Sequence, residues 1–404
     1  MYNFSLFLLF QYTNYVFLRN VFIRNNLYVF DNMENPFEYQ RIVVGKTFVD
    51  REQEIKILTK AILSRENMLL YSPRRLGKSS LLQEVLLQID DQRIAINVDL
   101  WECLTEAEIA EKLATGIINA AFTKMEKAAA TLKEVITSTR PLMSLEPDGS
   151  IGLKLEYIEK DKTLKETLYL IETIAEKRKK KVIVFIDECQ VIAEFEGNRI
   201  EKLFRTVIQQ QRLVTYVFSG SKQHVLKAMV NQKTRPFYRQ LRPMTLGPIS
   251  LDAFTPFIKK GFSKIAHIDD NTIKEIYRFT GGNPQRTQQV CHFLFVRAQE
   301  GEKPTLEQVK KVVIDLCLTL NKEFEDELDS IKNKRQRAIL KALALDSTEK
   351  PLSADFIKKH ELGPSSSVQT ALKMLIEKGV LDESYHFIDP LFENWFIFKH
   401  KKTI

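Results

Sequence analysis

Apolar and polar positions along the chain follow two different rhythms. Short runs rich in apolar and β-branched residues end in small or polar ones, which is typical of buried strands in a parallel sheet. They lie at 67–71, 94–100, 182–187, 214–220 and 244–249. Between and after them, apolar residues recur every three or four positions, which predicts amphipathic helices. We therefore expect an α/β fold, a parallel sheet with helices on both faces.

Other stretches add detail to this outline. Alternating residues around a Pro-Asp-Gly turn at 144–156 predict a hairpin, and a helical pattern runs from about 106 to 136. The segment 48–55 leads into a helix with Asp50 as its expected N-cap. After residue 250 the chain is helical, and Gly281–Pro284 is expected to end one helix and start the next.

The last part of the chain has a pattern of its own. Three short helices are followed by two short β segments, which is the outline of a winged helix-turn-helix. The helices are expected at 337–345, 353–361 and 365–378, and the β segments at 380–381 and 385–388. The expected recognition helix carries only Lys373 and Lys378 against Glu377. This charge is weak for DNA binding, so a packing or regulatory role is an equal alternative.

Composition narrows the class of protein. The chain has 404 residues, of which 44% are hydrophobic and 28% charged, and a net charge of +8. This profile is typical of a globular protein, and the charge permits contact with nucleic acid or acidic surfaces without requiring it. The cysteines show no metal-ligand spacing, so we expect reduced core residues in a cytoplasmic protein. They are Cys103, Cys189, Cys291 and Cys317.

Residues 1–32 differ from the rest of the chain. They are rich in Phe, Tyr, Asn and Leu and contain no Lys. The apolar run from Ser5 to Phe10 is too short to span a bilayer, so no stable membrane insertion is expected. We expect a poorly ordered tail or translated upstream sequence before Met33; a hairpin at a membrane surface is the alternative.

A phosphate-binding pattern joins the first strand to the next helix. Gly77, Lys78 and Ser79 form the closing half of Gly-x-x-x-x-Gly-Lys-Ser, with Ser72 in place of the first Gly. Backbone N–H groups at a helix N-terminus bind phosphate, Lys78 can reach the β- and γ-phosphates, and the Ser79 hydroxyl can bind Mg²⁺. The nucleotide-binding residues expected in this loop are Ser72, Pro73, Arg74, Arg75, Leu76, Gly77, Lys78, Ser79 and Ser80.

A pair of acids follows a buried strand about a hundred residues later. Asp187 and Glu188 end the run 182–186, at the sheet edge where ligands bind in α/β folds. We expect Asp187 to bind Mg²⁺, directly or through water, and Glu188 to be the general base for the attacking water. The next strand ends near Ser221, which could sense the γ-phosphate or simply cap a helix.

Arginines are further candidates. A loop carries Arg235, Arg239 and Arg242, and arginines stabilise charge on a transferring phosphoryl group. We assign Arg239 a catalytic role, with an ordinary surface role as the alternative for each. Arg286 lies in the first turn of a helix, where a cation is disfavoured. Its position points to an anionic partner such as a nucleotide phosphate.

These motifs together resemble the archaeal-type P-loop ATPases of the AAA+ and signal-transduction ATPase superfamily. The resemblance runs from about Asn35 to Phe398 and includes the closing Asp389–Trp395. It implies a P-loop sheet, a helical lid and a winged helix. The implied roles are adenine contacts for Phe48, Val49 and Pro284, γ-phosphate sensing for Ser221, and lid sensing for Arg286 or a nearby cation. The sequence departs from the family where Asp50 and Ser72 replace glycines.

We therefore predict Mg²⁺-dependent binding and hydrolysis of ATP as a conformational switch, in which ATP closes the lid and winged helix on the core. The predicted domains are an N-terminal extension, an ATPase core, a lid and a winged helix, at 1–32, 33–249, 250–325 and 326–404. One alternative is an ATPase that acts on duplex DNA through the winged helix. Another is a nucleotide-binding scaffold with little turnover. A protein partner or a homo-oligomer is compatible with each.

Overall fold

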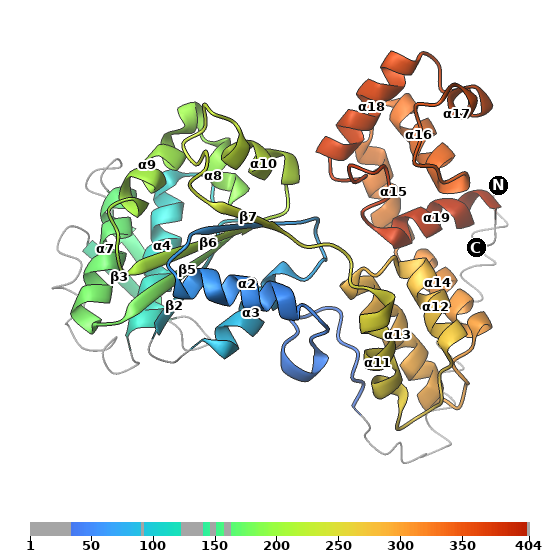
Figure 1. The fold of residues 1–404 in the computed structure, drawn as a ribbon, viewed down its shortest axis with the longest axis horizontal. Helices are drawn as coiled ribbons and strands as arrows, with labels where there is room; N and C mark the ends of the chain where they lie inside the picture. The colour runs from blue at the N-terminus through green and yellow to red at the C-terminus, as the bar shows by residue number, and fades with distance from the viewer. Residues whose placement is uncertain (1–33, 90–92, 123–139, 146–150, 157–162, 402–404) are drawn as a thin grey trace.

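The computed structural model describes residues 34–89, 93–122, 140–145, 151–156 and 163–401 (Figure 1). The expectation for 1–32 lies outside these residues. Figure 1 shows a lobe built on a β-sheet beside a second lobe made of helices. Within the described residues, no helix has the length and apolar character needed to cross a membrane.

The sheet of the first lobe confirms the predicted parallel fold. Its five strands pair in the order β2-β5-β6-β1-β7, and all of the pairs are parallel. The strands are β1 (Met68–Tyr71), β2 (Arg93–Asp99), β5 (Lys181–Asp187), β6 (Val214–Gly220) and β7 (Arg242–Thr245). Every residue of β6 is buried, as expected for a strand covered on both faces.

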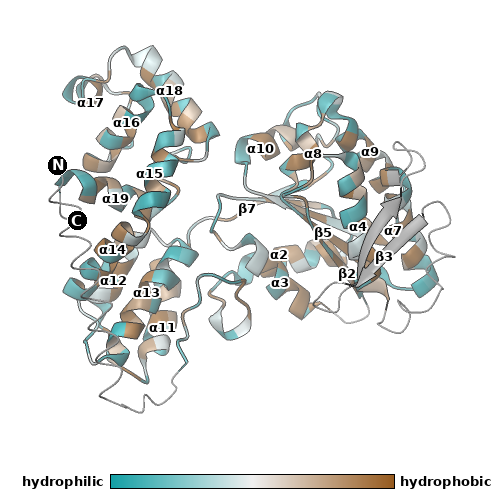
Figure 2. Cartoon of the chain, turned by 180° about the vertical axis from the view of Figure 1, so that it is seen from behind, coloured by the Kyte–Doolittle hydropathy of each residue, from teal (hydrophilic) through white to brown (hydrophobic). Residues whose placement is uncertain are grey.

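Helices cover both faces of this sheet. Phe185 belongs to a core cluster with α2 and α3, whereas Val184, its neighbour in β5, packs in a cluster with α4, α7 and α9. The core helices are α2 (Glu52–Leu63), α3 (Lys78–Gln88), α4 (Glu106–Ala121), α7 (Thr163–Arg178), α8 (Gln190–Glu194), α9 (Arg199–Ile208) and α10 (Gln223–Asn231), with 3-10 turns η1 (Gly45–Thr47) and η2 (Glu196–Asn198). Successive residues of a strand point to opposite faces, so both clusters draw on the same strands. Figure 2 shows the apolar residues gathered along the sheet and the helix faces against it.

The predicted hairpin is present. Strands β3 (Arg140–Leu145) and β4 (Ile151–Glu156) pair antiparallel, while their turn and the predicted helix beyond 122 lie outside the described residues.

The predicted N-cap of α2 was wrong, because Asp50 does not occupy that position. That position is Arg51, and both residues have left-handed φ angles of 60° and 71°. The buried Arg51 guanidinium donates to the carbonyl of Gly247 at 2.5 Å, which fixes this turn.

The second lobe begins with the predicted helical lid. Its helices are α11 (Leu251–Phe262), α12 (Asp270–Thr280), α13 (Pro284–Gln299), α14 (Leu306–Thr319) and α15 (Asn321–Ser330). The break between α12 and α13 follows the prediction. Gly282 has a φ of 72°, and a Cβ there would lie 2.3 Å from the carbonyl of Ile249. The Asn283 side chain then caps α13 by accepting from the N–H of Arg286.

The winged helix packs on the lid. Its helices are α16 (Lys334–Leu345), α17 (Ala354–Lys359), α18 (Ser365–Glu377) and α19 (Pro390–Lys401). The two predicted β segments meet in an antiparallel bridge between Leu381 and Phe387. One core cluster runs from Phe254 in the lid to Trp395 in α19, so the lid and the winged helix share a core. All four cysteines are free and buried, as predicted.

Candidate nucleotide-binding site

The phosphate loop crosses from β1 to α3 in the conformation that its sequence requires. Gly77, the N-cap of α3, has a φ of 85°, which favours glycine. Arg75 also has a positive φ, of 70°. Ser72 has a φ outside this region and is fully buried, so the serine in place of the first Gly fits the loop. Ser72, in place of the first Gly of the motif, therefore leaves the loop conformation undisturbed.

Lys78 lies inside the loop and has no carboxylate as a direct partner among the described residues. Its Nζ donates to the carbonyls of Ser72 and Pro73 at 3.0 and 3.1 Å, and the residue is 8% exposed. Burial lowers the pKa of Lys78, while the nearby Asp187 and Glu188 act to raise it. A buried cation satisfied only by carbonyl oxygens is suited to an incoming anion such as phosphate.

Oxygen atoms next to this lysine fit a magnesium ion. Asp187, at the end of β5, accepts from Ser79 Oγ at 3.1 Å and from Ser219 Oγ at 2.7 Å. Neighbouring ligands of octahedral Mg²⁺ lie about 3 Å apart, because Mg–O distances are about 2.0–2.1 Å. The spacing of Ser79 and Asp187 therefore fits two adjacent positions in a Mg²⁺ shell. The sequence analysis did not single out Ser219, whose hydroxyl orients this carboxylate.

Glu188 is held by side chains from two other elements. Its Oε2 accepts from Ser221 Oγ at 3.2 Å and from Nε2 of Gln190, a residue that the sequence analysis missed. A Cβ on Gly220 would lie 2.2 Å from Gln190, so the glycine after Ser219 leaves room for this contact. The structure thus brings together Glu188 and Ser221, which were proposed separately as base and sensor.

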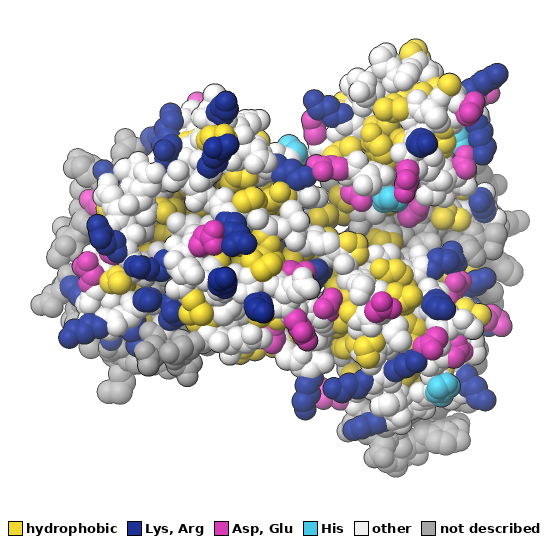
Figure 3. Space-filling model, in the orientation of Figure 1, with side chains coloured by type: hydrophobic (Ala, Val, Ile, Leu, Met, Phe, Trp, Pro, Cys, Tyr) yellow, Lys and Arg dark blue, Asp and Glu magenta, His cyan; other side chains and the backbone are white. Residues whose placement is uncertain are grey.

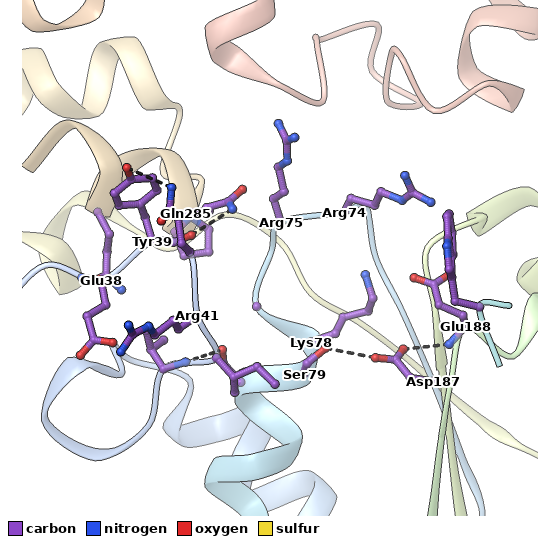
Figure 4. A pocket seen from close by; sticks show the side chains of 18 residues that line it. Glu38, Tyr39, Arg41, Arg74, Arg75, Lys78, Ser79, Asp187, Glu188 and Gln285 are labelled. Carbon is purple, nitrogen blue, oxygen red and sulfur yellow. Dashed lines mark hydrogen bonds between the residues drawn. The ribbon is translucent and has the colours of Figure 1, made fainter. Parts of the chain in front are cut away.

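A cavity of about 490 Å³ opens over the loop, between the core and the lid. It is lined by nine of the predicted residues: Arg74, Arg75, Gly77, Lys78, Ser79, Ser80, Asp187, Glu188 and Pro284. The other predicted residues, which do not line it, are Phe48, Val49, Ser72, Pro73, Leu76, Ser221, Arg239 and Arg286. Figure 4 shows Tyr39 and Gln285 across the loop from Asp187 and Glu188. One end of the cavity is therefore acidic, and the other is formed by the lid and the segment that carries Tyr39.

That segment, residues 34–49, forms a strap that the sequence analysis did not identify. Residues 38–43 line the cavity. The strap is tied to α13 by a bond from Gln285 Nε2 to the Tyr39 carbonyl at 3.0 Å. It is tied to α3 by a bond from the N–H of Val43 to Ser80 Oγ at 3.1 Å. Its sequence has no periodic pattern, so no local signal marked it.

The residues implied as adenine contacts lie at different depths. Pro284 lines the cavity. Phe48 is partly buried against the cluster of α2 and α3, and Val49 is 7% exposed in the lid cluster. Both lie at the C-terminal end of the strap and do not line the cavity in this structure.

The three loop arginines lie away from the cavity. Arg235 is paired with the buried Glu201, and Arg242 with Glu66 at 3.0 Å. Arg239 packs over the Tyr238 ring. The next residue, Gln240, accepts from Gln209, close to where β6 begins, at 3.1 Å. The structure therefore places Arg239 at the amino edge of the sheet, opposite the phosphate loop.

Comparison with protein families agrees with this geometry. Residues 48–290 match the model of an ATPase domain found predominantly in Archaea, which is more than half of the chain. The chain belongs to this archaeal ATPase family. Residues 322–397 match the model of a "probable winged helix domain". An uncharacterized ATP-binding protein of Pyrococcus abyssi is 28% identical over 161 residues. That match spans 37% of this chain and 45% of the relative.

Solved structures show the same fold. The Walker-type ATPase of Pyrococcus abyssi has a TM-score of 0.64 and 19% identity, covering 90% of this chain and 99% of that chain. The ORC2 protein of Aeropyrum pernix, in ADPNP and ADP complexes, has a TM-score of 0.53 and 12% identity. That match covers 93% of this chain and 99% of the other. At these identities the likeness concerns the fold, and it extends from the sheet to the winged helix.

In this archaeal-type ATPase, the predicted anionic partner of Arg286 is a carboxylate of the winged helix. Arg286 is 3% exposed, and its Nε donates to Asp389 Oδ1 at 3.0 Å, with a second bond from Nη2 to Oδ2. Arg75 of the phosphate loop donates to the same Asp389 at 2.6 Å and to Glu323 at 2.9 Å. Asp389 thus joins the loop, the lid and the winged helix at one point.

Proposed function

We propose that this ATPase-family chain binds ATP with Mg²⁺, hydrolyses it, and couples the reaction to movement of the winged helix. The observation that carries the proposal is the meeting of Lys78, Ser79, Asp187 and Glu188 at the carboxyl edge of the sheet, beside the cavity. These groups offer a cation for phosphate, oxygens for a metal ion and a carboxylate for water in one place.

The roles follow from the contacts. The N–H groups of the loop and Lys78 would bind the β- and γ-phosphates, and Ser79 and Asp187 would hold Mg²⁺. The ion would neutralise charge on the phosphate oxygens. Glu188 accepts a proton from the attacking water, and Ser221, already bonded to Glu188, is placed to respond to the γ-phosphate.

The base of the nucleotide belongs at the other end of the cavity. We propose that it lies between Pro284 and the strap residues around Tyr39, while Phe48 and Val49 anchor the C-terminal end of the strap in the core. Backbone groups of an extended segment can read a base edge by hydrogen bonds, and Gln285 and Gln288 fix the strap for that purpose. This proposal keeps the adenine role of Pro284 and makes that of Phe48 and Val49 indirect.

The deciding experiment compares Glu188→Gln with Lys78→Ala. Glu188→Gln should keep ATP affinity and lower kcat by about 10²–10⁴-fold, because the proton acceptor is lost. Lys78→Ala should abolish measurable nucleotide binding, because the cation in the loop is lost. Steady-state hydrolysis and equilibrium binding of ATP, each with Mg²⁺ and with a chelator, give both quantities.

The matched control is Glu194→Gln, an exposed carboxylate of α8 paired with Lys222. It should leave both affinity and turnover unchanged. If Glu188→Gln behaves like this control while wild type binds ATP, the chain is the nucleotide-binding scaffold of the alternative prediction. If Lys78→Ala binds ATP normally, the site itself is wrong.

The switch is supported by the bridge at Asp389. Arg75 lines the cavity and Arg286 lies two residues after Pro284, which also lines it, and Asp389 of the winged helix accepts from both arginines. A phosphate that recruits either arginine must compete with this carboxylate. The sequence-based prediction has ATP closing the winged helix on the core. The bridge favours the opposite order, and we propose that ATP loosens the winged helix.

The structure bears on two of the predicted partners, a second copy of the chain and duplex DNA. Arg239 lies at the edge of the sheet opposite the phosphate loop of the same chain. Its predicted catalytic role therefore requires that it reach the phosphate loop of a second copy of the chain. The DNA alternative gains no support from α18, where Lys373 lies 3.9 Å from Glu377. Figure 3 shows basic side chains interspersed with acidic ones on the face in view. ATPase assays with and without duplex DNA, at two salt concentrations, test this alternative directly.

A further inference from the structure

Trp101 is a large aromatic residue exposed at the wall of the cavity. It follows β2 and is 55% exposed, although both the residue before it and Cys103 are buried. The turn is firmly anchored. The N–H of Trp101 donates to Asp99 Oδ1 at 2.9 Å, and the N–H of Leu100 donates to the carbonyl of Asp187 at 3.2 Å. The backbone that carries the indole is therefore fixed beside the acidic end of the cavity.

The guanidinium of Arg74, in the phosphate loop, lies over the Trp101 ring. Its guanidinium carbon is 4.5 Å from the centre of the Trp101 ring, within the range of a cation–π contact. Stacking leaves the N–H groups at the edge of the guanidinium free to donate to an anion. Figure 4 shows Arg74 on the Glu188 side of the loop, whereas Arg75 extends away from Lys78. The positive charge of Arg74 also contributes to lowering the pKa of Lys78.

Of the other arginines weighed for the phosphates, Arg239 lies over Tyr238 at the opposite edge of the sheet, and the remaining four have carboxylate partners. Arg75 and Arg286 bind Asp389, Arg235 binds Glu201, and Arg242 binds Glu66. No carboxylate of the described residues forms an ion pair with Arg74. Arg74 is thus a cation at the phosphate end of the cavity whose contact within the chain is an aromatic face.

We propose that Trp101 is a positioning residue that directs Arg74 toward the terminal phosphate of ATP. This inference rests on the proposed function. When water attacks the γ-phosphorus and gives its proton to Glu188, the bond to the β–γ bridging oxygen breaks, and its electron pair leaves with ADP. Arg74 stabilises the negative charge on the terminal phosphoryl oxygens during this step. A residue that contacts only the terminal phosphate distinguishes ATP from ADP.

The test is a double-mutant cycle with Trp101→Leu, Arg74→Ala and the double variant. We measure kcat and the Kd values of ADP and of a non-hydrolysable ATP analogue. Arg74→Ala should lower kcat by about tenfold or more, and Trp101→Leu by about fivefold. Both should weaken the ATP analogue relative to ADP, whose affinity stays within about twofold. The double variant should match Arg74→Ala, because Trp101 acts through Arg74.

Two further variants separate positioning from structure. Trp101→Phe keeps an aromatic face and should retain most of the rate. Leu104→Ala removes an 83% exposed apolar side chain from the same turn and should change nothing. Additive losses in the cycle, or equal losses of ADP and ATP-analogue affinity, would overturn the inference. If wild type fails to bind or hydrolyse ATP, the proposed function fails instead, so the two failures are distinguishable.

Discussion

At the scale of single residues, Arg235 is a structural group rather than a phosphate ligand. It contacts Asn198 and Glu201, and Glu201 has no exposed surface. Removal of one partner leaves a buried charge unpaired, so Arg235→Ala should lower the free energy of unfolding by roughly 3–5 kcal/mol. Denaturant unfolding measures this loss. Arg242→Ala, which breaks an exposed pair with Glu66, should cost at most about 1 kcal/mol.

The nucleotide affinities of Arg235→Ala and Arg242→Ala should differ less than their stabilities. Neither arginine lines the cavity, so both variants should bind ATP as wild type does under conditions where they are folded. A stable Arg235→Ala protein with weakened ATP binding would contradict the assignment and return this residue to the phosphate site.

These arginines also show what the sequence could predict at this scale. The groups Lys78, Ser79, Asp187 and Glu188 were predicted because each is fixed by a local motif and because parallel strands end at one edge. The role of an arginine depends on the partner that folding brings to it. Glu201 is 34 residues from Arg235, and no pattern in the sequence pairs them.

At the scale of elements, the strap 34–49 holds the lid and the phosphate loop together. Phe37 is 1% exposed and packs on Gly261 of α11 and against the rings of Phe262 and Phe295. A Cβ on Gly261 would come within 2.3 Å of the Phe37 ring, so this ring must move in Gly261→Ala. We expect a lower melting temperature and weaker binding of ADP, measured by thermal unfolding with and without nucleotide.

Gly247→Ala is the matched control for this variant. A Cβ there meets nothing within 4 Å. It should bind ADP as wild type does. Unchanged ADP affinity in Gly261→Ala would show that the strap can shift without affecting the cavity, and would remove its proposed role in nucleotide binding.

The strap marks the limit of sequence-based prediction for elements. Strands were predicted from short apolar runs and helices from apolar residues every three or four positions, which indicated the parallel sheet and the winged helix, whereas the lid was implied by the family resemblance. The strap has no such period. Its path is set by distant contacts, such as the bond between the N–H of Glu38 and Gln288 Oε1 at 3.0 Å. The predicted N-cap Asp50 failed for the same reason, because Gly247 fixes the preceding turn through Arg51.

At the scale of the whole molecule, the sequence predicted the units but not how they meet. The closing Asp389–Trp395 motif was noted only as part of a resemblance. In the structure its first residue bonds to the phosphate loop and the lid, and Leu391 and Trp395 fill the shared core. Helix α19 is therefore held by apolar packing in the shared core and by the bonds of two arginines to Asp389, just before its first residue. The apolar contacts can persist when the ionic ones break.

This arrangement makes Asp389→Asn a direct test of coupling between nucleotide and winged helix. Asn keeps an oxygen that can accept from the N–H of Leu391, as Asp389 does at 3.0 Å, so the start of α19 is preserved. The negative charge that competes with phosphate for Arg75 and Arg286 is lost. Because coupling between two sites is reciprocal, weaker docking of the winged helix implies tighter ATP, by about fivefold or more.

Two measurements on the full chain decide the outcome. ATP and ADP affinities should both rise in Asp389→Asn, ATP the more, and small-angle scattering should show a larger radius of gyration without nucleotide. The control, Asp346→Asn, removes a carboxylate that pairs with Lys359 at 2.7 Å inside the winged helix, and it should change neither quantity. If Asp389→Asn instead weakens ATP binding, the carboxylate supports the arginines as phosphate ligands. The winged helix would then close over ATP, in the order that the sequence first suggested.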